Sequence, residues 1–400
     1  MKKKEILSKN HNKKGKNNQN NHHTNTFLVH KHNKSSMEVD EENENDLTEP
    51  SDKISFIKFQ NISQIENTYN LEKNFSESTE KLHQIRINYL NNQTYFDIKK
   101  RLILLDWMME VSSQFGFKRQ TYYLSLIILD IYFSTIKYEI VTSELQLIGV
   151  CCLFISSKKE EIVIPSVNYF AISCDNTYTI TQILEYEFKI LNTLNWKIIY
   201  PTLNDWANII TYQWDLFSDK EALNNNNYLP KFRNDKNYND TLIKNYFLLL
   251  DIISLDYYSI FIHEKNICIG IIYYLIGICK DYFQFQDILN MFSNHNNNNN
   301  NKNNNNLNNI NNSNLYAYKD WFTNICIKVF NFQIHELEES LNYIGLFFHL
   351  QFQYNKPVKE GITYEDNLQI QTHNSNNIQS MNEIYELRFN NNNNSIQNNF

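Results

Sequence analysis

Glycine and proline are scarce in this chain, which has 7 glycines and 5 prolines among 400 residues. All-β sandwiches and barrels need a turn signal every few residues, and so few turn-forming residues cannot supply it. No two glycines have the spacing of a dinucleotide-binding fingerprint or of a P-loop, so the common phosphate-cradling loops are excluded as well. The shortage therefore favours an all-α fold and argues against a nucleotide-binding enzyme.

Paired cysteines, an excess of positive charge and long apolar runs are also missing. The six cysteines form no C-x-x-C pair and mostly lie in apolar stretches, which is typical of buried thiols and not of disulfides or zinc sites. A net charge of −7 is a poor match to nucleic-acid binders, which concentrate positive charge. The longest apolar run, 267–279, is too short to span a bilayer, and no apolar signal segment follows Met1. We therefore expect an intracellular protein with no cofactor, no metal, no nucleic-acid partner and no membrane partner.

Asparagine is abundant and very unevenly distributed. Tracts of it fill 17–21, 224–227, 294–314 and 388–399, whereas none occurs between Asn92 and Asn168. Such tracts bury almost no apolar surface and cannot offset the entropy lost when a backbone is ordered. The pattern predicts disordered ends, a helical middle and an insertion within it. The segments are a disordered head (1–60), an extension with a helix (61–94), a first domain (95–200), a second domain (201–332) with a loop insertion (294–314), a C-terminal helix (333–352) and a disordered tail (353–400).

Between the head and the tail, apolar residues recur with the period of a helix. Residues 145–157 carry no charge and are apolar on every side, so this helix must be surrounded by others. The helix at 264–280 has the same property, which indicates two bundles, each built around one buried helix. Thr142 is a predicted N-cap, and Thr179 with Gln182 fits a capping box. Helices are expected near 100–114, 119–136, 145–157, 179–191, 202–213, 241–256, 261–282, 286–292, 316–331 and 335–351.

Four stretches resemble the cyclin family in their order and approximate spacing. They are Arg101-Leu-Ile-Leu-Leu-Asp-Trp-Met-Met-Glu-Val111, Leu145-Gln-Leu-Ile-Gly149, Ser157-Lys-Lys-Glu-Glu-Ile162 with Pro165, and Tyr178-Thr179 through Glu187 to Trp196 and Pro201-Thr202. The resemblance covers a first cyclin box at about 95–200, while the second, at about 201–332, matches only in pattern. It implies an all-α fold of two tandem five-helix boxes. The form of the first stretch is more similar to A-, B- and E-type cyclins than to transcriptional ones.

The resemblance implies a regulatory subunit without catalytic residues, which forms a heterodimer with a cyclin-dependent kinase. In that family the first box holds a glutamate of the kinase against the lysine of its ATP site, an arrangement that phosphoryl transfer requires. The matching lysine and glutamate are Lys158 and Glu187, with Phe188, Trp196 and Ile198 as the apolar part of the kinase-binding surface. The alternative for the charged pair is a surface salt bridge, worth about 0–1 kcal/mol.

A second surface is implied by the same resemblance, a groove in which family members dock Arg-x-Leu substrate peptides. Trp107 would form an apolar wall, Glu110 would pair with the arginine of the peptide, and Gln146 would hydrogen-bond its backbone. Arg101 and Asp130 match a buried ion pair that ties two helices together. The positions that match the groove are Ile103, Leu104, Trp107, Glu110, Leu145 and Gln146.

The sequence departs from the family pattern at three of these places. Lys100 stands where a methionine is usual, Lys159 replaces an aromatic residue after Lys158, and Ile131 replaces an arginine after Asp130. The head contains neither an R-x-x-L destruction box nor a K-E-N triplet, which leaves its acidic Ser/Thr segment at 35–52 as the candidate degradation signal. The head can be simply a solvated tail with a basic and an acidic part. Alternatively, lysines 2–4, 13, 14 and 16 form a weak nuclear-import patch, and a nuclear location is favoured over a cytoplasmic one.

Three functions remain open on these residues. The first is a cell-division cyclin that activates a kinase, and the second is a transcription-type cyclin whose kinase phosphorylates RNA polymerase II. The third is a cyclin-fold adaptor that binds other macromolecules without a kinase, and the absence of a basic stripe in 95–332 ranks it last. An enzyme is disfavoured further because the chain has no G-x-S-x-G, no H-E-x-x-H and no metal-ligand spacing of Cys and His.

Overall fold

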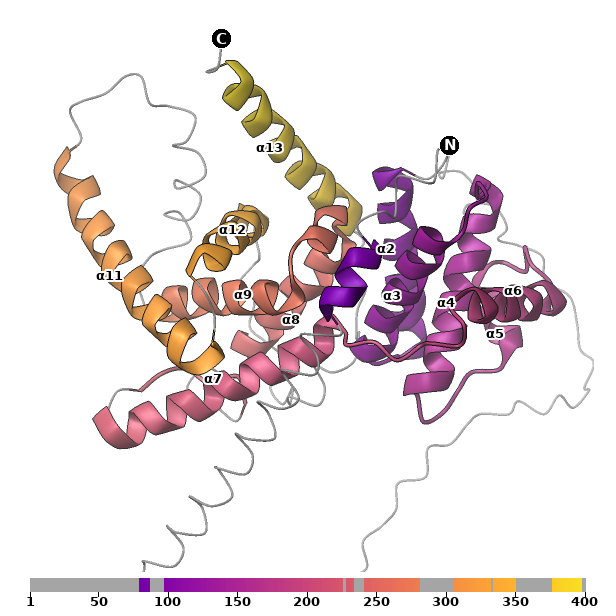
Figure 1. Cartoon of the computed structure of the whole chain (residues 1–400), viewed down its shortest axis with the longest axis horizontal. Coiled ribbons are helices and arrows are strands. Elements are labelled where there is room, and N and C mark those ends of the chain that lie inside the picture. The colour runs from indigo at the N-terminus through magenta and orange to yellow at the C-terminus, as the bar shows by residue number, and fades with distance from the viewer. Residues whose placement is uncertain are drawn as a thin grey trace, which may run out of the picture. The chain divides into compact units, whose positions relative to one another are not determined.

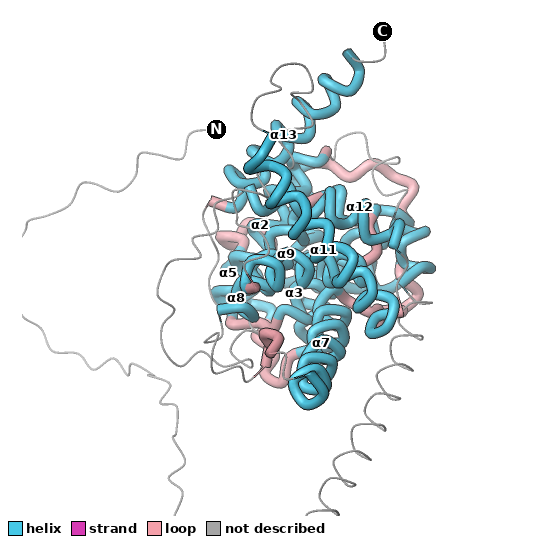
Figure 2. Tube along the Cα trace, turned by 90° about the vertical axis from the view of Figure 1, so that its left-hand side faces the viewer, coloured by secondary structure: helices cyan, strands magenta, loops and turns pink. Residues whose placement is uncertain are grey.

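The computed structural model describes residues 79–86, 97–225, 228–233, 241–280, 305–331, 334–349 and 376–397. All of them belong to one compact unit, Phe56–Phe400. The described residues form helices, turns and connecting segments, with no β-strand among them (Figure 2). The prediction of an all-α fold is therefore confirmed.

The first bundle surrounds helix α4 (Leu145–Glu160), as the uncharged stretch predicted (Figure 1). Every residue of 145–157 except Gln146 is buried. Thr179 caps α6 through the predicted box, since its hydroxyl accepts the Gln182 N–H while the Gln182 side chain accepts the Thr179 N–H. Thr142 is not an N-cap of α4, because a 3₁₀ turn at Thr142–Glu144 leads directly into that helix. The helices around α4 are α2 (Ile98–Phe115), α3 (Arg119–Thr135), α5 (Val167–Ser173) and α6 (Ile180–Thr193).

The second bundle surrounds α9 (Glu264–Cys279), whose apolar residues from Ile267 to Ile276 are buried on all sides. Its packing partners among the described helices are α7, α8, α11 and α12, so the second expected bundle is also present. Two 3₁₀ helices, η2 (Tyr257–Phe261) and η4 (Leu346–His349), connect its parts, and the helix expected at 286–292 lies outside the described residues. The bounds are α7 (Leu203–Asn225), α8 (Thr241–Leu255), α11 (Asn305–Phe330) and α12 (Ile334–Gly345).

Two helices extend into segments that were expected to lack structure. Helix α11 begins at Asn305, inside the predicted loop insertion 294–314, and α13 (Asn377–Gln397) lies inside the predicted disordered tail 353–400. Both expectations are wrong for these residues. Once buried residues further along nucleate α11, adding asparagine turns costs little, and α13 is ordered because Met381 and Ile384 are fully buried. The overall composition of an asparagine-rich segment does not show whether a few of its apolar residues are buried. The head 1–60 lies outside the described residues.

Buried ion pairs link helices that are far apart in the sequence. The predicted pair is present, with Arg101 Nη2 3.2 Å from Asp130 Oδ1, and Arg86 binds the same carboxylate at 2.7 Å. Arg86 also binds Glu264 of α9 at 3.1 Å, which connects the first bundle to the second. If one partner of these pairs were removed, the remaining buried charge would be unpaired and would strongly destabilise the fold. These contacts fix how the two bundles pack.

The cysteines behave as the sequence predicted, since none of the six is in a disulfide and five are buried. Burial raises the pKa of the Cys174 thiol to about 12, and that of Cys268 also to about 12. These thiols are therefore protonated and unreactive at neutral pH. In the part of the chain that the structure describes, no helix is both long and apolar enough to cross a membrane.

Candidate functional site

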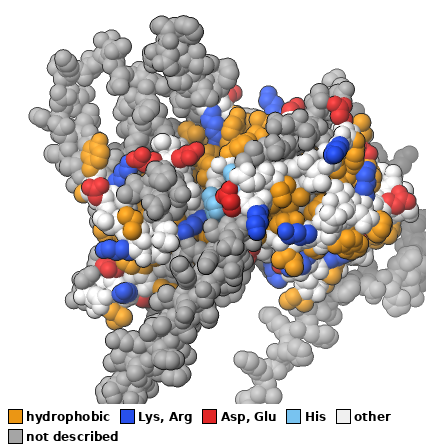
Figure 3. Space-filling model, viewed as in Figure 1, with side chains coloured by type: hydrophobic (Ala, Val, Ile, Leu, Met, Phe, Trp, Pro, Cys, Tyr) orange, Lys and Arg blue, Asp and Glu red, His pale blue; other side chains and the backbone are white. Residues whose placement is uncertain are grey.

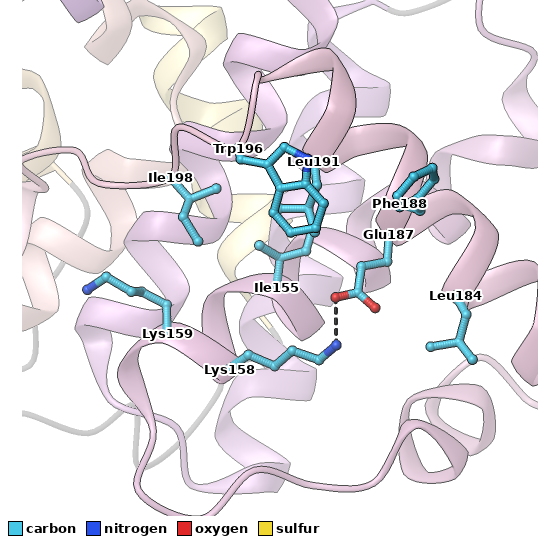
Figure 4. Close-up of a pocket in the computed structure, with 9 residues that line it drawn as sticks. All are labelled: Ile155, Lys158, Lys159, Leu184, Glu187, Phe188, Leu191, Trp196 and Ile198. Atoms are coloured by element: carbon cyan, nitrogen blue, oxygen red, sulfur yellow. Dashed lines mark hydrogen bonds and ion pairs between the residues drawn. The ribbon is translucent and has the colours of Figure 1, made fainter.

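Lys158 and Glu187 face each other across the gap between α4 and α6. Lys158 Nζ lies 2.6 Å from Glu187 Oε1, in a pair that Figure 4 shows at the mouth of a pocket. The ammonium group also lies 3.9 Å from the centre of the Phe154 ring. The Lys158 side chain nevertheless remains 40% exposed, so the pair is ordered but open to a partner. Its place in the last turn of α4 is favourable, because the carbonyl end of a helix attracts cations.

The pocket beside this pair has a volume of about 540 Å³ and is mainly apolar. Ile155 and Leu191 are buried and form its floor, whereas Phe188 and Trp196 are 59% and 60% exposed on its rim. The two rim rings stand edge to face, with centroids 6.4 Å apart. In Figure 4, Lys159 points away from the charged pair. The lining residues are Ile155, Lys158, Lys159, Leu184, Glu187, Phe188, Leu191, Trp196 and Ile198.

Trp196 is placed on this rim by a turn with an unusual backbone conformation. Asn195 and Trp196 have φ values of 50° and 60°, in the left-handed region that bulky residues rarely occupy. The Trp196 N–H donates to Leu191 O at 2.8 Å and closes the end of α6, while its indole N–H donates to Asn192 Oδ1. The turn costs conformational energy and places a large aromatic ring in solvent, a combination that points to a binding role.

Helix α6 is built to present such a surface. Ile183 and Ile190 face the core with no exposed area, while Leu184 and Phe188 lie on the opposite side. Directly after α4, Ile162 and Val163 are two further exposed apolar residues of this bundle, with 91% and 83% of their surface accessible. Figure 3 shows apolar side chains gathered over the first bundle. Residues 162 and 163 were missed by the sequence analysis, although a β-branched run directly after a charged helix end is a usable signal.

The predicted docking-groove positions are only partly on the surface. Ile103 is 56% exposed and Glu110 is exposed, whereas Trp107 and Gln146 are half-buried. Leu104 and Leu145 are buried, so they can form only the floor of a groove. Leu104 packs closely against α4, where a Cβ added to Gly149 would lie 2.9 Å from its Cδ1. The positions follow one side of α2 and the start of α4.

Metal-binding geometry is not found in the described residues. No group of three or more His, Cys, Asp or Glu side chains there could hold a metal ion. The strongest features are the charged pair, whose Lys158 end is exposed, and the aromatic rim. This arrangement is suited to binding a protein surface, with hydrogen bonds that set the register and apolar contacts that supply the free energy.

Comparison with known proteins shows which family the first bundle resembles. Residues 72–199 match the family described as "Cyclin, N-terminal domain", which includes all of the first bundle and its charged pair. These residues therefore form a cyclin N-terminal domain. The matched region begins before the predicted boundary at 95, because it takes in the short helix at 79–86.

The curated relatives that match this region include cyclins of the A, B and E types. Over 133 residues the chain is 35% identical to G2/mitotic-specific cyclin-A of Hydra viridissima, covering 33% of this chain and 31% of the relative. Over 115 residues it is 41% identical to cyclin-B1-1 of Oryza sativa subsp. japonica, covering 29% and 25%. Over 121 residues it is 38% identical to G1/S-specific cyclin-E1 of Gallus gallus, covering 30% of each. The chain therefore matches less than a third of the length of these relatives.

A solved structure is also similar in shape, that of a viral cyclin from herpesvirus Saimiri. The match has a TM-score of 0.43 and 16% sequence identity, and covers 70% of this chain and 97% of the viral chain. At these values it adds nothing to the family assignment, which depends on the sequence of the first bundle.

Proposed function

We propose that this cyclin is the regulatory subunit of a cyclin-dependent Ser/Thr protein kinase and controls progression through the cell cycle. The observation that carries the proposal is the Lys158–Glu187 pair beside an exposed aromatic rim. An ammonium group and a carboxylate held in this way can hydrogen-bond the backbone of a partner segment, while Phe188, Trp196 and Ile198 pack against its apolar side. Binding would hold the mobile glutamate-bearing helix of the kinase in its active position.

The relatives favour a cell-division role over a transcriptional one. Those compared above carry the names mitotic-specific cyclin-A, cyclin-B1-1 and G1/S-specific cyclin-E1. Residues 101–111, which carry the "Ile-Leu-Leu-Asp-Trp" form, lie in the matched region. The proposal for partners includes Arg-x-Leu peptides at the surface formed by Ile103, Trp107, Glu110 and Gln146.

Reconstitution with purified kinases tests this function. The full-length chain is mixed in turn with kinases of the cell-division and transcription types, and complex formation is measured by size-exclusion chromatography. Phosphorylation of a Ser-Pro peptide is measured in parallel. We expect a cell-division kinase to bind and to gain activity. Binding and activation of a transcription-type kinase alone would favour the second role, and no binding to either type would contradict both.

We also propose that this cyclin acts in the nucleus. The support is the lysine cluster at residues 2–4, 13, 14 and 16 of the head. Fluorescent fusions of the full-length chain are expected to be nuclear, and replacing these six lysines by glutamine should shift the fluorescence to the cytoplasm. A matched control replaces six lysines outside the head that line neither proposed surface. Nuclear fluorescence that survives the first replacement would show that import depends on other residues or on a partner.

A further inference from the structure

Helix α13 is held against both bundles by contacts between Asn377 and Arg388. At its start, Asn377 Nδ2 donates to Asp106 Oδ1 of α2 at 3.1 Å. In the middle, Met381 and Ile384 have no exposed area. Further on, Arg388 forms two hydrogen bonds of 3.0 and 2.6 Å with the fully buried Asp256. These contacts hold α13 in one defined position. Figure 1 shows its first turns beside α2.

The seated helix leaves a groove between itself and α2. The groove has a volume of about 820 Å³, enough for several peptide residues. On α13 its wall consists of Ile378, Asn382 and Tyr385, at spacings of four and three residues that place them on one face. Glu386 lies beside them, and the wall on α2 is formed by Lys99, Leu102 and Ile103.

One stripe of α2 continues from this groove into the proposed docking surface. Lys99, Ile103, Trp107 and Glu110 are separated by four, four and three residues, so they share one face of the helix. Along the stripe the character changes from cationic at Lys99, through apolar at Ile103 and Trp107, to anionic at Glu110. Ile103 belongs to both surfaces. Ile103 therefore joins the groove walled by α13 to the proposed docking surface, and the two together are called the longer groove below.

We propose that α13 extends the docking surface, so that the longer groove binds a linear peptide whose order is basic, apolar and then acidic. The inference rests on the docking part of the proposed function and adds the residues after the leucine. From Glu110 to Ile103 the helix rises about 10 Å, roughly the reach of an arginine and two further residues of an extended chain. Lys99 lies about 6 Å beyond, so it meets the second or third residue after the leucine.

Each part of the outer groove has a defined role in this recognition. An apolar residue after the leucine packs between Ile103 of α2 and Tyr385 of α13. The Asn382 amide can hydrogen-bond the peptide backbone, and Lys99 attracts a carboxylate that follows. Glu386 opposes the same carboxylate, so its charge limits the preference that Lys99 creates. Specificity of this kind comes from complementary charges more than from buried area.

Three labelled peptides test the inference by fluorescence polarisation with the full-length chain. They are Arg-Ala-Leu-Gly-Gly-Gly, Arg-Ala-Leu-Ile-Glu-Glu and Arg-Ala-Leu-Ile-Lys-Lys. We expect the acidic peptide to bind three to ten times more tightly than the glycine peptide and about threefold to fivefold more tightly than the lysine peptide. Lys99→Gln should remove the preference for acid over lysine, and Glu386→Gln should increase it, since exposed charge pairs are worth about this much.

A matched pair of bulky substitutions separates the groove from the helix that forms it. Asn382→Trp fills the groove and should reduce the affinity for the acidic peptide to that for the glycine peptide. Gln379→Trp lies on the same helix, is exposed and does not line the groove, so it should change neither. Melting curves confirm that both variants are folded.

Two results would overturn the inference. The first is equal affinity for all three peptides, and the second is an Asn382→Trp variant that still prefers the acidic peptide. If the glycine peptide also fails to bind, the whole docking surface is wrong, whereas kinase binding at Lys158 and Glu187 is measured separately and is not affected.

Discussion

Replacing Asp130 by alanine is expected to lower the free energy of unfolding by about 3–5 kcal/mol. Its carboxylate has no exposed area and accepts hydrogen bonds from both Arg86 and Arg101. The substitution would leave two guanidinium groups in a dry interior with no counter-charge on that side. Because domains are stable by only about 5–15 kcal/mol, the loss is a large fraction of the total.

Urea denaturation followed by circular dichroism measures this loss. The matched control is Asp219→Ala. The Asp219 side chain is 58% exposed and forms an ion pair with Lys231, so this substitution should lower the free energy of unfolding by at most about 1 kcal/mol. Asp130→Asn keeps the shape and two acceptor lone pairs, so its loss should lie between the two. Equal losses for Asp130→Ala and Asp219→Ala would contradict the structural role assigned to the Arg101–Asp130 pair.

Arginine usage explains why such pairs can be recognised from the sequence. The chain has five arginines and 32 lysines. Each arginine forms an ion pair with a carboxylate whose side chain is at most 12% exposed. The pairs are Arg86 with Asp130 and Glu264, Arg101 with Asp130, Arg119 with Asp251, Arg233 with Asp215, and Arg388 with Asp256. Guanidinium groups are weakly hydrated and bind carboxylates at two points, so a chain that otherwise uses lysine places them where charges are buried.

The buried helices could be predicted because their signal is local. In α4 and α9 about a dozen consecutive residues carry no charge, so other helices must pack against them on all sides. The capping box of α6 depends on only two nearby residues, Thr179 and Gln182. The Lys158–Glu187 pair is different, since the two residues are 29 positions apart. Their pairing was predicted only from the resemblance to a family, and in the structure Lys158 Nζ lies 2.6 Å from Glu187 Oε1.

Helix α13 could not be predicted, because its order depends on distant partners. Its residues have a low mean hydropathy and end in an asparagine tract, which is typical of disorder. The contacts that hold it are with Asp106 and Asp256, at least 130 residues away in the sequence. Its five-residue core, Met381 to Tyr385, is too short for the helical period to be distinguished from chance.

The apolar face of the first bundle also has a physical consequence for the free protein. Ile162, Val163, Phe188 and Trp196 are each more than half exposed. Large exposed apolar patches are typical of surfaces that a partner covers. Contacts of the proposed partner with Trp196 would offset the conformational energy of the left-handed turn at Asn195 and Trp196.

Replacing both Lys158 and Glu187 by alanine is expected to abolish capture of the kinase found by reconstitution. At protein interfaces, truncating one side of a buried, hydrogen-bonded charge pair costs about 2–5 kcal/mol, which weakens binding at least about 30-fold. In the free protein the Lys158 side chain is 40% exposed and that of Glu187 is 12% exposed, so removing this single pair should leave the fold and the circular dichroism spectrum unchanged.

The chain offers a matched control for this experiment in the second bundle. Lys319 Nζ lies 2.6 Å from Glu338 Oε1, the same separation as in the site, and both side chains are exposed. Removing both should leave kinase binding unchanged, because α11 and α12 carry no part of the proposed surface. Binding is measured by biolayer interferometry at two salt concentrations. A Lys158/Glu187 variant that binds as tightly as the Lys319/Glu338 variant would show that the partner does not use this pair, and the kinase-binding surface would have to be sought elsewhere on the first bundle.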